Sequence, residues 1–202
     1  MNSHPHLEHI LVLDMMRTGS QEVHRFANIE YCVRDDTLYI FGTNDRVDHL
    51  MNLMYDPVDL GDDLGLLHTG YYLAATALMA ELDDMGYLDQ ITMTSGHSAG
   101  AALAAIVAGY LLIPTVGFGC PPYADASAQK AIHPTSVFYE VDTDLVPKLR
   151  QLWPAKHPYV RSPYTKKLTY PGGIVDRVIS RIIRGHHIPT YAKALGADKE
   201  LW

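Results

Sequence analysis

The sequence has few of the features that mark secreted or membrane-spanning proteins. Only two of its 202 residues are cysteines, Cys32 and Cys120, and both lie in strand-like contexts rather than at a paired spacing. A disulfide framework is therefore not expected, and the pattern favours buried thiols in a reducing compartment. The tripeptide Asn-x-Ser/Thr does not occur, so the chain offers no N-glycosylation acceptor.

Long apolar runs are absent as well. No stretch approaches the roughly 20 residues of a membrane-spanning helix, and the N-terminus lacks the basic region of a signal peptide. These absences predict a cytoplasmic protein. His4, His6 and His9 have no cysteine nearby, so a solvated tail is favoured over a metal site, and neither a metal nor an organic cofactor is expected.

What remains is the composition of an ordinary globular domain. The chain is 48% hydrophobic and 19% charged, and we find no internal repeat, low-complexity tract or linker. Residues 1–202 are therefore expected to form one compact domain whose core needs no cross-links. The net charge is −7, and the basic residues are scattered without interleaved aromatics, which argues against nucleic acid as a partner.

Apolar strands alternate with helical patterns along the chain. We expect strands at 26–33, 37–41, 91–94, 113–120 and 136–141. Helical patterns occupy 44–54, 71–85 with an apolar stripe, 126–132, 174–183 and 190–195, while 1–20 form a helix or strand. That stripe consists of Leu73, Ala77, Leu78 and Leu82. Residues 55–67 and 148–173 read as irregular. The alternation predicts an α/β fold with a mostly parallel sheet and helices on both faces.

One stretch carries a chemical signature. A short β-branched strand leads through Gly96-His97-Ser98-Ala99-Gly100 into a helix of small residues. Strand, sharp turn and helix is the context in which G-x-S-x-G forms a nucleophile elbow, where the serine backbone is strained. Gly96 and Gly100 would relieve the crowding around that serine. The alternative interpretation is that Ser98 only caps the helix.

A nucleophilic serine needs a base within hydrogen-bond reach and a third group that holds the base. The order Ser, Asp or Glu, His is typical of α/β-hydrolases. After Ser98, this order leaves Asp142 or Asp144 as the acid at the end of a strand. The later histidines that can serve as the base are His157, His186 and His187.

Two backbone donors are expected to form the oxyanion hole. One is the N–H of Ala99, directly after the serine, and the second would come from Gly42-Thr43, which follows an earlier strand. The next segment, Asn44 to Met54, carries an apolar face formed by Val47, Leu50, Met51 and Met54.

Six short segments, in order, resemble the class 3 lipases, α/β-hydrolases typified by triacylglycerol lipases of filamentous fungi. The family patterns are F-R-G-T/S, V-H-x-G-F, T-G-H-S-L-G-G-A-L, T-F-G-x-P, D-x-V-P and H-x-x-x-x-Y. The matching segments are Phe41-Gly42-Thr43, Leu67-His68-Thr69-Gly70-Tyr71, residues 94–103, residues 116–121, Asp144-Leu145-Val146-Pro147 and residues 186–191. The chain departs from these patterns at Gly42, where Arg is usual, at an inserted-looking Ser95 and at Ala99, where Leu is usual.

The resemblance implies an α/β-hydrolase fold and a serine carboxyl-ester hydrolase that works through an acyl-serine intermediate. It implies Ser98 as the nucleophile, Asp144 as the orienting acid and His186 as the general acid/base. His187 is the alternative base and Asp142 the alternative acid. Two further histidines, His68 and His97, are expected outside the reacting groups, as structural or hydrogen-bonding neighbours.

The same resemblance implies that Thr43 and Ala99 form the oxyanion hole and that Asn44 to Met54 takes the place of the fungal lid. The substrate would be an acylglycerol or a short- to medium-chain ester, with transient contact to a lipid interface. The lower chain length and the lack of the fungal disulfides weigh against interface activation. Two alternative functions stay open, a catalytically inactive lipid-binding module and an acyltransferase or thioesterase with the same triad.

Overall fold

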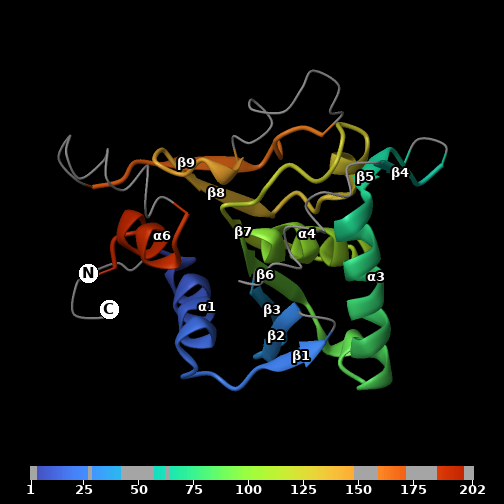
Figure 1. The fold of residues 1–202 in the computed structure, drawn as a ribbon, viewed down its shortest axis with the longest axis horizontal. Helices are drawn as coiled ribbons and strands as arrows, with labels where there is room; N and C mark the ends of the chain where they lie inside the picture. Colours follow the sequence, from blue (N-terminus) through green and yellow to red (C-terminus); the bar gives the residue numbers. More distant parts are fainter. Residues whose placement is uncertain are drawn as a thin grey trace.

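A seven-stranded sheet with helices on both faces forms the centre of the molecule (Figure 1). The computed structural model describes residues 4–26, 29–41, 57–61, 64–147, 159–171 and 186–197. The strand order is β1-β2-β3-β6-β7-β8-β9. Their bounds are β1 (His24–Phe26), β2 (Ile29–Arg34), β3 (Thr37–Phe41), β6 (Met93–His97), β7 (Thr115–Phe118), β8 (Val137–Val141) and β9 (Thr165–Leu168).

The sheet is mostly parallel, as predicted. β3, β6, β7, β8 and β9 pair in parallel, whereas β1, β2 and β3 pair antiparallel. The β2–β3 hairpin turns through Asp35 and Asp36, which both have positive φ angles of 47° and 60°. Two such residues give the turn the twist that a tight hairpin requires, and aspartate tolerates this conformation better than most residues. The predicted strand at 26–33 is in fact part of two strands, β1 and β2.

Two hydrophobic clusters lie on opposite faces of the sheet. In β3, Leu38 and Ile40 pack into one cluster while Tyr39 and Phe41 pack into the other, because successive side chains of a strand point to opposite faces. Helices α3 (Thr69–Asp84) and α4 (Ala99–Leu111) cover the first face. Helices α1 (Leu7–Thr18) and α6 (Ile188–Ala194) cover the second.

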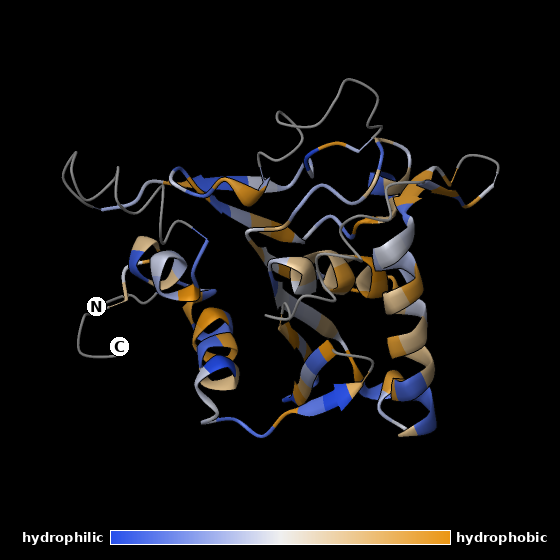
Figure 2. Ribbon diagram, in the orientation of Figure 1, coloured by the Kyte–Doolittle hydropathy of each residue, from blue (hydrophilic) through white to orange (hydrophobic). Residues whose placement is uncertain are grey.

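Helix α4 is apolar along its whole length, while α1 shows both hydrophobic and hydrophilic residues (Figure 2). Residues 100–108 of α4 are all buried, since the helix lies between the sheet and α3. Its many alanines keep it thin enough to fit in this layer. A helix that is apolar all round is expected only in such a buried position.

Several predicted elements differ from the observed ones. Residues 55–67, predicted as a loop, include the hairpin β4 (Pro57–Asp59) and β5 (Leu66–His68), and β9 lies in the stretch 148–173 that was predicted to be irregular. Both additions are short, and β9 is polar because it lies at the sheet edge. Two 3-10 turns, η1 (Leu88–Gln90) and η2 (Ala128–Ala131), complete the described elements, and η2 replaces the helix predicted at 126–132.

The apolar stripe predicted on α3 is also corrected. Leu73 is 52% exposed, and the buried face is formed by Gly70, Tyr71, Ala75, Leu78 and Leu82. Leu78 and Leu82 of the predicted stripe are buried, but at 3.6 residues per turn Leu73 lies on a different side of the helix from them, whereas Tyr71 and Ala75 share their side. The helical patterns predicted at 44–54 and 174–183 lie outside the described residues.

Both cysteines are free, as predicted, with Cys32 buried and Cys120 partly buried. Burial raises the pKa of the Cys32 thiol to about 11, so this thiol stays protonated. No helix among the described residues combines the length and the apolar character needed to cross a bilayer. Within the same residues, no group of three or more His, Cys, Asp or Glu side chains is arranged to hold a metal ion.

The N-terminal histidines do not form the solvated tail that was predicted, because His9 is buried in α1. Its Nδ1 lies 3.3 Å from the Tyr39 hydroxyl, and Nδ1 of His6 lies 3.0 Å from the Tyr139 hydroxyl. Burial lowers the pKa of both rings, and that of His6 falls to about 4. These imidazoles are therefore neutral in the folded protein.

Acidification from pH 6.5 to pH 4 is expected to destabilise the fold through these rings. The unfolded chain takes up protons near pH 6.5, whereas folded His6 resists protonation down to about pH 4. Stability is therefore full above pH 6.5 and falls below it. We expect His6 to account for about 1–2 kcal/mol, because water screens a half-exposed ring. Melting temperatures of the wild type and His6→Phe between pH 7 and pH 4 measure this, and parallel curves would contradict it.

Candidate active site

The turn between β6 and α4 has the geometry of a nucleophile elbow. Ser98 is the single residue between the two elements, with φ 57° and ψ −131°. This conformation costs a non-glycine residue about 1–3 kcal/mol. The Ser98 N–H donates to the Phe118 carbonyl at 2.9 Å, which ties the strained turn to β7. A Cβ on Gly96 would lie 2.3 Å from the Gly100 carbonyl oxygen, so only glycine allows the helix to start here.

Ser98, His186 and Asp144 lie in one hydrogen-bonded line. The Ser98 Oγ is 2.6 Å from Nε2 of His186, and Nδ1 of His186 is 2.8 Å from Oδ2 of Asp144. A carboxylate only accepts, so Nδ1 carries the proton and Nε2 of a neutral ring can accept the serine proton. This tautomer is the one that a general base needs.

The Asp144 carboxyl group is completely buried, and its oxygens are fully engaged. Oδ1 accepts the Val146 N–H at 2.8 Å, and Oδ2 accepts the Tyr191 hydroxyl as well as the His186 ring. Burial and the Asp144 charge raise the pKa of Tyr191 well above 10, so its hydroxyl remains a donor. These three donors offset the cost of a buried charge and fix the carboxylate orientation.

His97 holds the backbone of His186 in place. Burial lowers the pKa of the His97 imidazole well below 6.5, so the ring is neutral. Its Nε2–H donates to the His186 carbonyl at 2.8 Å, and the two ring centroids are 4.8 Å apart. The predicted role of His97 as a hydrogen-bonding neighbour is confirmed.

Gly119 leaves room for this arrangement at the end of β7. A Cβ at this position would lie 2.8 Å from Cε1 of His186 and 2.9 Å from both Oδ2 of Asp144 and the Tyr191 hydroxyl oxygen. Its φ of +62° also favours glycine. No role was predicted for Gly119 or Tyr191, although both lie in the matched segments 116–121 and 186–191. A glycine directly after a buried strand was the available signal.

The alternative base and the alternative acid do not take part in the hydrogen bonds that join Ser98, His186 and Asp144. His187 is exposed and caps α6, while the adjacent His186 faces Ser98. Asp142 is exposed, and its Oδ1 accepts the Tyr170 N–H at 3.0 Å. His68 is buried elsewhere, with its ring centroid 4.5 Å from that of Tyr71.

Only one of the two expected oxyanion donors, Ala99, lies among the described residues. Ala99 is the first residue of α4, and the first N–H groups of a helix have no acceptor within the helix. Its amide is therefore available beside Ser98. Thr43, His157 and the segment 44–54 lie outside the described residues.

The sequence matches no family model, and no curated protein is similar to it at a significant level. The structure, however, is similar to that of the triacylglyceride lipase of Rhizomucor miehei, with a TM-score of 0.59 at 16% identity over 82% of this chain and 79% of that one. It is similar to the Rhizopus microsporus var. chinensis lipase, with a TM-score of 0.57 at 16% identity over 83% and 74% of the two chains. A triacylglycerol lipase from Penicillium expansum gives 0.54 at 14% identity over 84% and 80%.

The chain has the α/β-hydrolase fold. The predicted resemblance to the fungal class 3 lipases is confirmed for the fold, which is what similarity at such low identity shows. In an α/β-hydrolase fold, reacting groups gather at the carboxyl ends of the parallel strands. Ser98, Gly119 and Asp144 follow β6, β7 and β8 in this way, and these three strands are neighbours.

Proposed function

We propose that the chain is a serine carboxyl-ester hydrolase, a lipase or esterase that cleaves acylglycerols or short- to medium-chain esters. The observation that supports this best is the hydrogen-bonded line of Ser98, His186 and Asp144 at a strained strand-to-helix turn. A serine that only capped the helix would need neither a histidine at 2.6 Å nor a positive φ. Two of the similar structures are a triacylglyceride lipase and a triacylglycerol lipase, which supports an ester of a fatty acid as the substrate.

In this mechanism, Ser98 Oγ attacks the ester carbonyl carbon while Nε2 of His186 takes its proton. Asp144 stabilises the imidazolium that forms and keeps the ring oriented. The Ala99 N–H, with the proposed second donor at Thr43, stabilises the negative oxygen of the tetrahedral intermediate. His186 then protonates the leaving alkoxide, and an acyl group remains on Ser98.

Water completes the cycle by the same route. His186 removes a proton from a water molecule, the resulting nucleophile attacks the acyl-serine carbonyl, and Ser98 leaves with the proton that His186 returns. The proton transfers between Ser98 and His186 run along the 2.6 Å hydrogen bond between them, and Asp144 keeps the ring oriented throughout. The reaction needs no metal or organic cofactor, since the histidine and the backbone amides supply the base and the electrophilic assistance.

A p-nitrophenyl alkylphosphonate tests the proposal, because it reacts with activated serines and leaves a stable adduct. We expect one adduct per chain, located on Ser98 by peptide mass mapping, and a parallel loss of p-nitrophenyl ester hydrolysis. Ser95 is the internal control, since it lies in β6 three residues before Ser98 but donates to the Val116 carbonyl at 3.1 Å. Absence of both labelling and hydrolysis would favour a binding module instead.

Tyr191→Phe is expected to lower kcat about tenfold with little change in KM. The substitution removes one of three donors to Asp144 and so loosens the carboxylate that orients His186. Tyr159→Phe is the matched control, because this buried hydroxyl donates to the Leu67 carbonyl and touches none of the reacting groups. Equal kcat losses in the two variants would contradict a specific role for Tyr191.

A further inference from the structure

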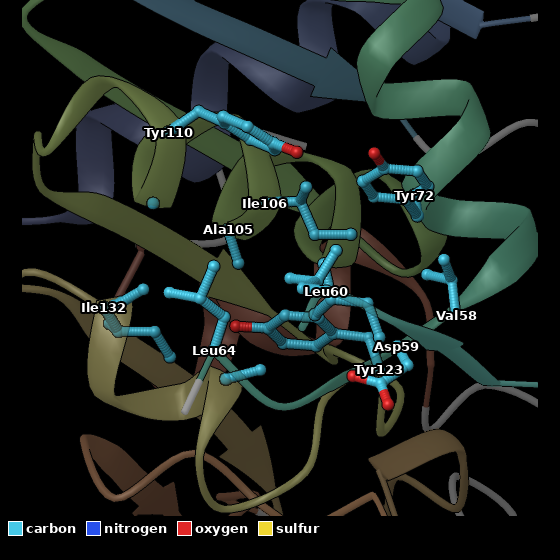
Figure 3. A pocket seen from close by; sticks show the side chains of 14 residues that line it. Val58, Asp59, Leu60, Leu64, Tyr72, Ala105, Ile106, Tyr110, Tyr123 and Ile132 are labelled. Atoms are coloured by element: carbon cyan, nitrogen blue, oxygen red, sulfur yellow. The ribbon is translucent and has the colours of Figure 1, made fainter. Parts of the chain in front are cut away.

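A second feature of the fold is an open cavity of about 460 Å³ against the outer part of α4. Its walls come from α3, α4, the β4–β5 hairpin and the region of η2 (Figure 3). None of Ser98, Asp144 and His186 lines it. Its α4 residues run from Ala105 to Tyr110, which places them about 10–18 Å along the helix from Ser98 at a rise of about 1.5 Å per residue.

The lining is mainly aliphatic. Ten of the fourteen lining residues are aliphatic or small, among them Leu60, Leu64, Ile106, Gly109, Ala131 and Ile132. Protein interiors rarely leave voids much larger than a water molecule, whereas sites for small molecules typically measure about 300–1,000 Å³. Leu64 and Tyr110 are 60% and 51% exposed, so apolar groups at its edge face solvent. The size and lining fit one apolar chain.

Tyr123 adds a specific polar signal to this apolar lining. Its hydroxyl oxygen is buried and has no hydrogen-bond partner among the described residues. In Figure 3 the ring lies along the cavity wall, with the hydroxyl directed toward the side of Leu64 and Ile132. Burial raises the pKa of this hydroxyl well above 10, so it stays a donor. A buried donor without an acceptor costs about 1–3 kcal/mol, which a ligand oxygen would recover.

The charges around the cavity disfavour the binding of an anionic ligand. No Lys, Arg or His is among the described residues that line it, and the one carboxylate there is Asp59, which is exposed. Asp59 Oδ1 accepts the Gly61 N–H at 2.9 Å, which holds the side chain in place. A carboxylate head group would be repelled here, whereas an uncharged head group would not be.

We propose that this cavity binds one neutral single-chain lipid, such as a long-chain alcohol or a monoacylglycerol. The alkyl or acyl chain lies against the aliphatic walls, and an uncharged oxygen of the ligand accepts the Tyr123 hydroxyl proton. The site is separate from Ser98 and does not depend on the proposed hydrolysis. It gives the protein a place for a neutral lipid that is not being cleaved.

The test uses 1-decanol as the probe and sodium decanoate at pH 8 as its anionic counterpart. We expect isothermal titration to show one 1-decanol per chain and at least tenfold weaker binding of decanoate. Gly109→Leu should weaken 1-decanol binding at least tenfold by filling the cavity. A Cβ on Gly109 meets only Ala131, at 3.7 and 3.9 Å, so the new side chain has room. Absence of 1-decanol binding to the wild type would overturn the proposal.

A pair of tyrosine variants keeps the test decisive if Gly109→Leu does not fold. Tyr123→Phe should raise the melting temperature of the free protein, because it removes an unpaired hydroxyl, and weaken 1-decanol binding about fivefold. Tyr159→Phe should lower the melting temperature, because it removes a made hydrogen bond, and leave binding unchanged. Equal affinities for 1-decanol in the wild type and Tyr123→Phe would overturn the proposed contact.

Ser98→Ala separates this site from the proposed active site. We expect it to bind 1-decanol as the wild type does, whether or not the wild type hydrolyses esters. Binding that persists in Gly109→Leu and disappears after phosphonate labelling of Ser98 would place the alcohol at the active site, and the proposal would then be wrong.

Discussion

Removing the Ser98 hydroxyl or the His186 imidazole is expected to lower kcat/KM for ester hydrolysis by a factor of about 10⁴–10⁶, and removing both should cost no more. The two groups are proposed to act as one unit, because Ser98 passes its proton to His186 across the 2.6 Å hydrogen bond when it attacks and receives one across it when it leaves. Once either is gone, the remaining partner has nothing to exchange that proton with. The measurement is p-nitrophenyl butyrate hydrolysis by Ser98→Ala, His186→Ala and the double variant.

His187→Ala is the matched control for this prediction. The two histidines are adjacent, but His187 is exposed at the start of α6 while His186 contacts Ser98 and Asp144. We expect His187→Ala to keep activity within about threefold of the wild type, as surface substitutions usually do. A larger loss in His187→Ala than in His186→Ala, or multiplicative losses in the double variant, would rule out the assigned base.

The elbow could be predicted from sequence because its geometry is local. Gly96 is required by the close approach of the Gly100 carbonyl, and both residues fall within five positions of the chain. The same holds for the β2–β3 hairpin, where Asp35 and Asp36 supply the two positive φ angles. In each case, neighbouring residues determine the backbone path, so the residue types alone indicate the structure.

The choice between His186 and His187 could not be made from residue types. Both positions carry a histidine, and they differ only in the direction in which the side chain points. That direction is decided by how α6 docks on the sheet. The hydrogen bond from His97 to the His186 carbonyl joins residues 89 positions apart, so no local pattern encodes it. The spacing left both histidines open as the base, and only the resemblance to the class 3 lipases favoured His186.

The strands that were not predicted, β4, β5 and β9, are short, and most of their exposed residues are polar. β9 reads Thr165-Lys166-Lys167-Leu168 and pairs with β8 only, so its lysines discourage further pairing at the sheet edge rather than signalling a strand. β4 and β5 form a separate three-residue ladder whose stability comes from packing on other elements. For such strands, tertiary contact outweighs intrinsic preference.

Gly119→Ala is expected to lower kcat/KM by about 10²–10³, although no reacting group is changed. The added methyl group would meet His186, Asp144 and Tyr191 at 2.8–2.9 Å, closer than carbon atoms are found to approach. At least one of the three must move, and a shift of the base or its carboxylate breaks the line to Ser98. Activity and the rate of phosphonate labelling should fall together.

Gly19→Ala separates this crowding from backbone strain. Gly19 has φ +75°, close to the +62° of Gly119, but nothing lies within 4 Å of its added Cβ. Both variants should lose about 1–2 kcal/mol of folding free energy through the left-handed backbone, and Gly119→Ala about 1–3 kcal/mol more through overpacking. Gly19→Ala should keep full kcat/KM. If the two variants lost the same stability and Gly119→Ala kept its activity, the packing of His186 over Gly119 would not hold the base in place.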